Sequence, residues 1–100
     1  MYYIKLKSES NGRLDCYAKF GYDTSYKTWW INAFEDDLEN KLNLGTSLRE
    51  LPTLVSLLNG LNRLGYVFNV SNQTMIDMII EEKMNMVEEP TNEQQQFGWN

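Results

Sequence analysis

The sequence predicts an α+β protein: a small antiparallel sheet, built from an N-terminal β-meander plus one later strand, with two to three helices packed on one face. Alternation of apolar and polar residues over 2–7 and again over 14–20 predicts the first two strands. Helical spacing of apolar residues in three segments after residue 34 predicts the helices. We expect one domain over residues 1–90 and a flexible C-terminal tail over residues 91–100.

The first two strands are expected to form a hairpin with a three-residue loop, Ser10–Gly12, in which Gly12 adopts the left-handed conformation. This loop pairs Glu9 with Arg13, and it keeps apolar residues on one face and polar residues on the other. The expected inner pairs are Tyr2–Phe20, Ile4–Ala18 and Leu6–Cys16, and the outer pairs are Tyr3–Lys19, Lys5–Tyr17 and Lys7–Asp15.

Residues 26–34 are rich in aromatic and β-branched side chains, which predicts a third strand. Its neighbouring tryptophans, Trp29 and Trp30, must lie on opposite faces, and the sequence leaves open which of them is buried. A short helix is predicted over residues 35–44, because Phe34, Leu38 and Leu42 are spaced by four, Asp37 and Lys41 can pair, and Gly45 can end it.

A second helix is predicted to begin at Pro52, or further back at the capping-box pattern of residues 47–50, and to end at Gly65. Its expected buried stripe is Leu54, Val55, Leu58, Leu61 and Leu64. A short strand over residues 66–70 follows, and then a last helix that is capped by Ser71 or Asn72 and ends near Glu89, before Pro90. The expected apolar stripe of this last helix is Ile76, Ile79, Ile80, the stem of Lys83, Met84 and Val87.

The composition gives no indication of an enzyme. The chain has no histidine, and its single cysteine, Cys16, is expected to point inward from a strand. Adjacent acids such as Glu81 and Glu82 lie about 100° apart on a helix and do not converge on one proton or one metal. We therefore expect no catalytic residues, no metal and no cofactor. An N-terminus without a signal-peptide pattern, and no apolar run of about 20 residues, predict a cytoplasmic protein that does not enter a membrane.

The net charge of −5 is carried by the C-terminal end. Residues 1–70 have eight Lys/Arg and eight Asp/Glu, whereas residues 71–100 have six acids and one base, Lys83. On the last helix, like charges four residues apart and acids at the C-terminal end do not favour helix stability. We interpret this face as a docking surface for a basic protein, formed by Asp77, Glu81, Glu82, Glu88 and Glu89. A solvated face that only aids solubility is the alternative interpretation.

Aromatic side chains offer a second set of contacts. Trp30, with Phe97 and Trp99 from the tail, is a candidate anchor for a pocket on a partner protein. Four of the five methionines lie on the last helix, where Met75 and Met84 fit near the expected buried stripe and Met78 and Met86 do not.

Aromatic and basic side chains alternate on the outer face of the predicted hairpin. Surfaces that bind single-stranded nucleic acid use the same combination, because bases stack on the aromatic rings and phosphates contact the basic groups. The side chains on this outer face are Tyr3, Lys5, Lys7, Tyr17 and Lys19. Ordinary exposed strands also carry Tyr and Lys, and Asp15 and the acidic C-terminal end oppose a polyanion.

The function that the sequence favours is a small, non-enzymatic protein-binding module or inhibitor, whose acidic helical face engages a basic protein, such as one that binds nucleic acid. By general analogy, phages and mobile elements are one source of such accessory proteins. The alternatives are single-stranded nucleic-acid binding through the Tyr/Lys face, and a homo-oligomeric structural subunit that self-associates through Trp30 or an unpaired strand edge.

Overall fold

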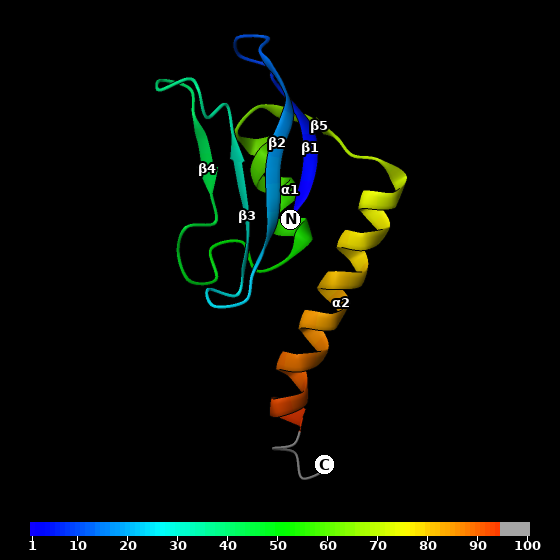
Figure 1. Cartoon of the computed structure of the whole chain (residues 1–100). Coiled ribbons are helices and arrows are strands. Elements are labelled where there is room, and N and C mark those ends of the chain that lie inside the picture. Colours follow the sequence, from blue (N-terminus) through cyan, green and yellow to red (C-terminus); the bar gives the residue numbers. More distant parts are fainter. Residues whose placement is uncertain (95–100) are drawn as a thin grey trace.

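In the computed structural model, five strands form one antiparallel sheet in the order β4-β3-β2-β1-β5, and two helices accompany it (Figure 1). The backbone is described for residues 1–94 and the side chains for residues 1–85. The elements are β1 (Tyr2–Ser8), β2 (Leu14–Asp23), β3 (Thr28–Ala33), β4 (Leu42–Leu44), α1 (Leu54–Arg63), β5 (Tyr66–Asn69) and α2 (Asn72–Gln94). The predicted α+β class and antiparallel sheet are confirmed, with β1–β4 as the meander and β5 as the later strand.

The hairpin between β1 and β2 follows the predicted register at its open end and departs from it near the turn. Tyr2 pairs with Phe20, Tyr3 with Lys19 and Ile4 with Ala18, as expected. A β-bulge then shifts the ladder, so that Leu6 lies opposite Asp15 and Lys7 opposite Leu14. Gly12 does adopt the left-handed conformation, with φ of 73°. The turn is one residue longer than predicted, because the Ser8 N–H, and not that of Glu9, donates to the Arg13 carbonyl.

The bulge reverses the orientation of the residues between it and the turn. Cys16, predicted to point into the core, is exposed, and Leu14 is exposed with it. Asp15 is responsible, because one carboxylate oxygen accepts a hydrogen bond from the Tyr17 N–H at 2.8 Å and the other from the Phe34 N–H at 2.8 Å. A carboxylate that satisfies two backbone donors stabilises an extra residue in the strand, and the alternation pattern alone does not contain that information.

The core lies between one face of the sheet and α1, which passes behind the sheet in Figure 1. Its largest fully buried side chains are Trp29, Phe20, Leu6, Ile31, Leu57, Leu61, Met78 and Thr28. Trp29 is therefore the buried tryptophan of the pair. Trp30 lies half-buried on the other face, with its ring over Gly21, where a Cβ would come within 3.0 Å of the ring.

The helix predicted over residues 35–44 does not form. Residues 35–40 make turns, and residues 42–44 form β4, the edge strand beside β3. Phe34 has a φ of 54°, which turns the chain out of β3. Asp37 then accepts hydrogen bonds from the N–H groups of Glu39 and Asn40, and its ion pair is with Arg13, not with Lys41. Local side-chain hydrogen bonds of this kind compete with a helix, and Leu38 is left 92% exposed.

Helix α1 begins two residues after Pro52, and Thr53 caps it through a reciprocal pair of hydrogen bonds with Ser56. The earlier capping-box pattern of residues 47–50 forms a turn, in which Glu50 binds backbone N–H groups. The helix buries Leu54, Leu57 and Leu61. Val55 and Leu64, both predicted as buried, are exposed. The predicted stop is confirmed at Gly65, which has a φ of 86°.

Helix α2 begins after Ser71, whose hydroxyl accepts a hydrogen bond from the Thr74 N–H at 3.1 Å. It continues past Pro90 to Gln94, so the predicted end at Glu89 is wrong and residues 91–94 are helical. Proline removes one N–H from a helix, but here the helix extends on either side of it. In Figure 1 the C-terminal part of α2 extends well beyond the sheet and α1. Residues 95–100, the rest of the predicted tail, lie outside the described residues.

Candidate interaction surfaces

The inward face of α2 carries the acids that were predicted to face solvent. Asp77, Glu81 and Glu82 are each half-buried, and they lie on the same side of the helix as Met78, which is 1% exposed in the core. Met75 packs against the core one turn earlier. Helical geometry brings residues three and four apart together, so the packing of Met78 directs its acidic neighbours toward the body as well.

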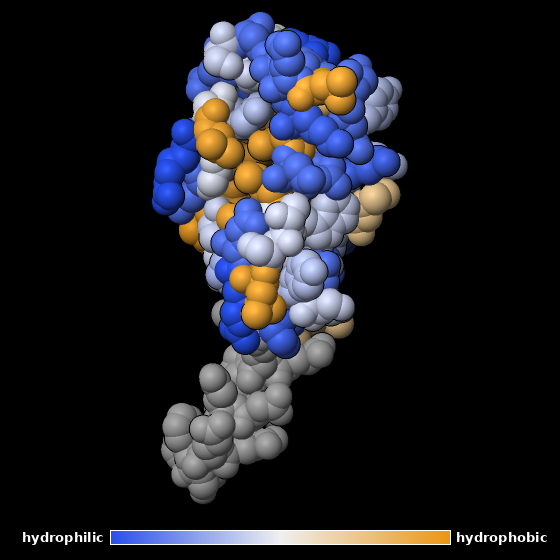
Figure 2. All heavy atoms as spheres, turned by 90° about the vertical axis from the view of Figure 1, so that its left-hand side faces the viewer, coloured by the Kyte–Doolittle hydropathy of each residue, from blue (hydrophilic) through white to orange (hydrophobic). Residues whose placement is uncertain are grey.

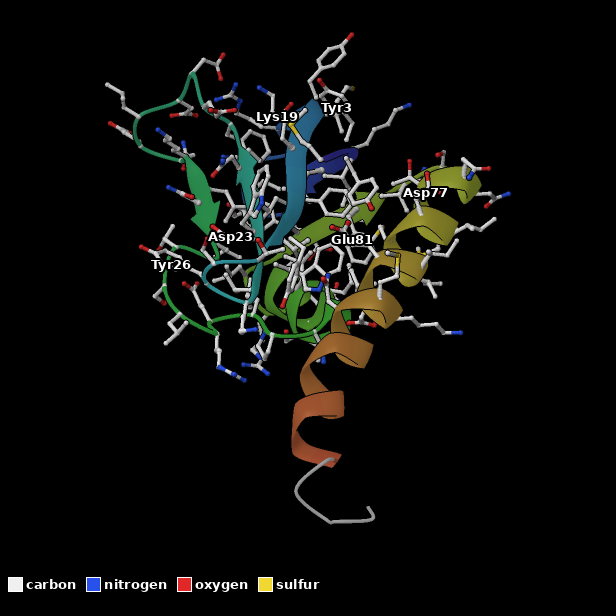
Figure 3. The ribbon with its side chains drawn as sticks, turned by 60° about the horizontal axis from the view of Figure 1, so that its bottom comes forward. Tyr3, Lys19, Asp23, Tyr26, Asp77 and Glu81 are labelled. Carbon is white, nitrogen blue, oxygen red and sulfur yellow. The ribbon has the colours of Figure 1, made fainter. Side chains whose placement is uncertain are left out.

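Glu81 is bound by the first strand. The Tyr2 hydroxyl donates to the Glu81 carboxylate at 2.5 Å and lies 3.4 Å from the Asp77 carbonyl oxygen. Burial of the phenol raises the pKa of Tyr2 above its ordinary value, and the bond to Glu81 and the charges of Glu81 and Asp77 raise this pKa further. Figure 3 shows Asp77 and Glu81 along the side of α2 that faces the sheet. A buried phenol needs an acceptor, and Glu81 supplies it.

Glu82 is bound by the other helix. Its carboxylate accepts a hydrogen bond at 2.6 Å from the N–H of Leu54, the first residue of α1. The first turn of a helix has N–H groups without partners and a positive end of its dipole, and both favour an anion. The carboxylate of Asp77 accepts a hydrogen bond from the Gln73 amide at 3.0 Å. Three of the five predicted acidic docking residues, Asp77, Glu81 and Glu82, therefore make bonds within the protein. The side chains of Glu88 and Glu89 lie outside the described residues, as do Phe97 and Trp99.

The opposite face of α2 is uncovered, and it carries four apolar side chains around the exposed Lys83. Ile76, Ile79, Ile80 and Met84 are 51%, 43%, 51% and 61% exposed, respectively. We call these four residues the isoleucine stripe. They belong to the stripe predicted to be buried, so the helix packs the other way round from the prediction. Their spacing of three, four and eight from Ile76 places them on one side of the helix.

The outer face of the sheet, opposite α1, carries the predicted Tyr/Lys surface. Tyr3 and Tyr17 are 53% and 78% exposed. Lys5 and Lys7 are exposed and Lys19 is half-buried. We call Tyr3, Lys5, Lys7, Tyr17 and Lys19 the outer sheet face. Figure 3 shows Tyr3 and Lys19 beside each other, away from Asp77 and Glu81. Trp30 is less available than predicted, because it packs over Gly21 at the border of this face.

Figure 2 shows the β4 side of the molecule, where hydrophobic side chains form one larger group and smaller separate ones among hydrophilic side chains. Leu38 and Leu48, in the loops on either side of β4, are both exposed. Scattered exposed leucines are common on protein surfaces and do not by themselves indicate a binding site.

Within residues 1–94 no helix is long and apolar enough to cross a membrane. Across the described part of the chain, no three His, Cys, Asp or Glu side chains come together in a way that could hold a metal ion. Comparison with protein-family models, with curated proteins and with solved structures finds no match to this chain.

Proposed function

We propose that this protein is a small non-enzymatic binding module that inserts the isoleucine stripe of α2 into an apolar groove on another protein. The partner is a basic protein, with Lys and Arg side chains around that groove. The observation that carries the proposal is the packing of α2: Met78, Glu81 and Glu82 face the body. The four residues of the isoleucine stripe face solvent.

Helical spacing supports this mode of binding. Helices that dock into grooves present anchors at positions i, i+3, i+4 and i+7 or i+8, and Ile76, Ile79, Ile80 and Met84 have this spacing. A soluble helix ordinarily buries such a stripe against its own core. Here Tyr2 and the N-terminus of α1 hold the opposite face inward. The stripe is therefore held in a fixed orientation, and this reduces the entropy lost on binding.

Charge favours a basic partner over a second copy of this chain. Residues 71–100 have six acids and one base and the chain has a net charge of −5, so two copies repel each other as they approach, whereas a basic protein is attracted. A groove lined by apolar side chains and bordered by Lys or Arg complements both features. An inhibitor that occupies a basic, nucleic-acid-binding surface on another protein would have this character.

The test starts by identifying the partner at the stripe itself. A photo-crosslinking residue is placed at Ile80, and a second protein carries it at Leu38, an exposed leucine on a distant loop. Crosslinking is carried out in cells that make this chain, and the protein that is captured only from position 80 is purified. Its affinity is then measured for the wild type, for Ile79→Ser/Ile80→Ser and for Leu38→Ser. Burial of one isoleucine contributes about 1.5–3 kcal/mol, so we expect the double variant to lose at least tenfold in affinity and Leu38→Ser to lose none.

Two results would contradict the proposal: no partner crosslinked from position 80, or equal affinities of the wild type and the double variant. Light scattering of the purified protein alone tests whether the stripe instead binds a second copy of this chain. A dimer that Ile79→Ser/Ile80→Ser dissociates would replace the basic partner by self-association. Because opposite net charges attract the two proteins to each other, the affinity should fall as salt rises, with the change mainly in the association rate.

A further inference from the structure

The outer sheet face combines rings and positive charges at adjacent positions of the ladder. Tyr3 of β1 lies directly opposite Lys19 of β2, and the bulge at Cys16 and Tyr17 lies opposite Lys5. Neighbouring strands are about 4.8 Å apart. Each tyrosine ring therefore has a lysine on the next strand, and Lys7 continues the basic row along β1.

The bulge also shapes the surface around these side chains. It leaves Cys16 and Tyr17 both exposed and creates a hollow on either side. One hollow, of about 360 Å³, is lined by Tyr3, Lys5, Cys16, Asn69, Ser71 and Thr74. The other, of about 520 Å³, includes Arg13, Tyr17 and Lys19 together with Glu35 and Asp36. Tyr3 and Tyr17 thus stand at the margins of two depressions, where one face of each ring can be covered by a flat group.

We propose that the outer sheet face is a second binding site, which takes single-stranded nucleic acid. Two bases stack on Tyr3 and Tyr17, and the phosphates between and beyond them contact Lys5, Lys7 and Lys19. Aromatic rings on a sheet with basic side chains around them are the elements that hold single strands without sequence readout. A duplex hides the faces of its bases and cannot make the stacking contacts.

The charges near this face are compatible with a polyanion along β1. Asp15 is held by the N–H groups of Tyr17 and Phe34, and Asp37 is paired with Arg13. Asp15, Glu35 and Asp36 line the larger hollow together with Tyr17, so phosphates are expected to follow Lys5 and Lys7 on β1 while only a base reaches Tyr17. The bonded acids of α2, Glu81 and Glu82, are engaged with Tyr2 and Leu54.

Fluorescence anisotropy with a 5′-labelled 12-nucleotide oligothymidylate tests the site, at low and at moderate salt. We expect the wild type to bind at low salt, with a slope of log K against log salt of about −2 for three lysines. Tyr17→Ala should weaken binding by about fivefold to 100-fold. Lys5→Gln/Lys19→Gln should bring the slope to about −0.7.

Matched controls use the same substitutions elsewhere. Tyr26→Ala alters an exposed tyrosine in the β2–β3 turn, and Lys41→Gln/Lys83→Gln removes two exposed lysines away from the outer sheet face. Both should bind like the wild type. The proposal is overturned by any of three outcomes: absence of binding at low salt, equal effects of the control and test variants, or equal competition by a DNA duplex of the same length. The isoleucine stripe is unaltered in every variant, so the result is independent of the function proposed above.

Discussion

Carboxylates in this protein bind backbone N–H groups where the chain leaves regular structure. Within the described residues five carboxylates do so: one at the bulge, three in turns and loops, and one at a helix N-terminus. They are Asp15, Asp23, Asp37, Glu50 and Glu82. In the sequence, such acids resemble a solvated surface, because nothing local shows which N–H group they will meet. The acidic docking face was predicted from the same appearance, and Glu82 is the clearest example of an acid that binds a backbone N–H of its own chain instead.

Glu50 provides a prediction on pH. It accepts hydrogen bonds from the Gly45 N–H at 3.1 Å and the Thr46 N–H at 3.0 Å, and these bonds lower the pKa of Glu50 below its ordinary value of 4.5. A lowered folded pKa gives stability that is present above the ordinary pKa and is lost as the pH falls through the folded value. Because Glu50 is exposed and solvent screens its charge, we expect Glu50→Gln to lower the free energy of unfolding by no more than about 1 kcal/mol at pH 7.

Urea unfolding at pH 7 and at about pH 2.5 measures this effect. The difference between the wild type and Glu50→Gln should shrink at the acidic pH, where both side chains are neutral. Glu9→Gln, at an exposed position beside the β1–β2 turn, is the control and should change stability little at either pH. A difference that stayed constant with pH would mean that the Glu50 charge does not stabilise this loop.

A pair of glycines provides the second prediction. Gly12 and Gly45 both have positive φ, 73° and 79°, but a Cβ at Gly12 would meet nothing within 4 Å. A Cβ at Gly45 would lie 2.1 Å from the Trp29 carbonyl oxygen. We expect Gly12→Ala to cost about 1 kcal/mol, from backbone strain alone, and Gly45→Ala more than about 3 kcal/mol. Thermal and urea unfolding compare the two variants, and similar losses would contradict the close approach of residue 45 to β3.

At the scale of the elements, periodicity predicted which residues share a face but not which face is buried. The stripe of α2 was grouped correctly, yet Ile76, Ile80 and Met84 are on the exposed side. Three contacts distant in sequence decide the orientation: Met78 in the core, Glu81 on Tyr2 and Glu82 on Leu54. The hydroxyl of Tyr2, on an inner strand position, was the available signal, because a buried phenol requires a partner.

The orientation of α2 gives a prediction on stability. Met78→Ala removes a side chain that is 1% exposed, and we expect a loss of about 2–4 kcal/mol. Ile80→Ala removes a side chain that is 51% exposed, so it should change the free energy of unfolding by less than about 0.5 kcal/mol. Urea unfolding of the two variants measures both numbers. The reverse order would show that the isoleucines, and not the methionine, pack against the body.

Strands and helices differed in how far local sequence determined them. The three aligned pairs from Tyr2–Phe20 to Ile4–Ala18, the left-handed Gly12 and the stop at Gly65 follow from alternation and turn chemistry. Residues 35–40 had helical spacing, but Asp37 binds the N–H groups of Glu39 and Asn40 and the chain turns there instead. Short apolar periodicity is ambiguous when an Asp can bond to the backbone two residues on.

At the scale of the whole molecule, the last part of α2 follows both the core and the isoleucine stripe in the sequence. Among the side chains of residues 1–85, those that are fully buried lie between residues 4 and 78, and α2 continues to residue 94. We therefore expect a protein shortened to residues 1–86 to keep its free energy of unfolding within about 1 kcal/mol. Urea unfolding measures this, and a large loss would show that residues 87–100 stabilise the fold. The shortened protein keeps Ile76, Ile79, Ile80 and Met84, so binding to the partner through the stripe should also persist.

The place of β1 in the sheet has a consequence for how the chain is synthesised and folded. β1 meets β2 through a local turn, but its other neighbour is β5, with Lys5 opposite Asn69. Contacts so distant in sequence form late, because a long loop must close first. Until residue 69 has left the ribosome, one edge of β1 has no partner strand and could pair with another chain. Lys5 and Lys7 lie on that strand, and charged side chains at an open edge oppose such pairing. We therefore expect the same two lysines to oppose aggregation of the newly made protein until β5 pairs with β1.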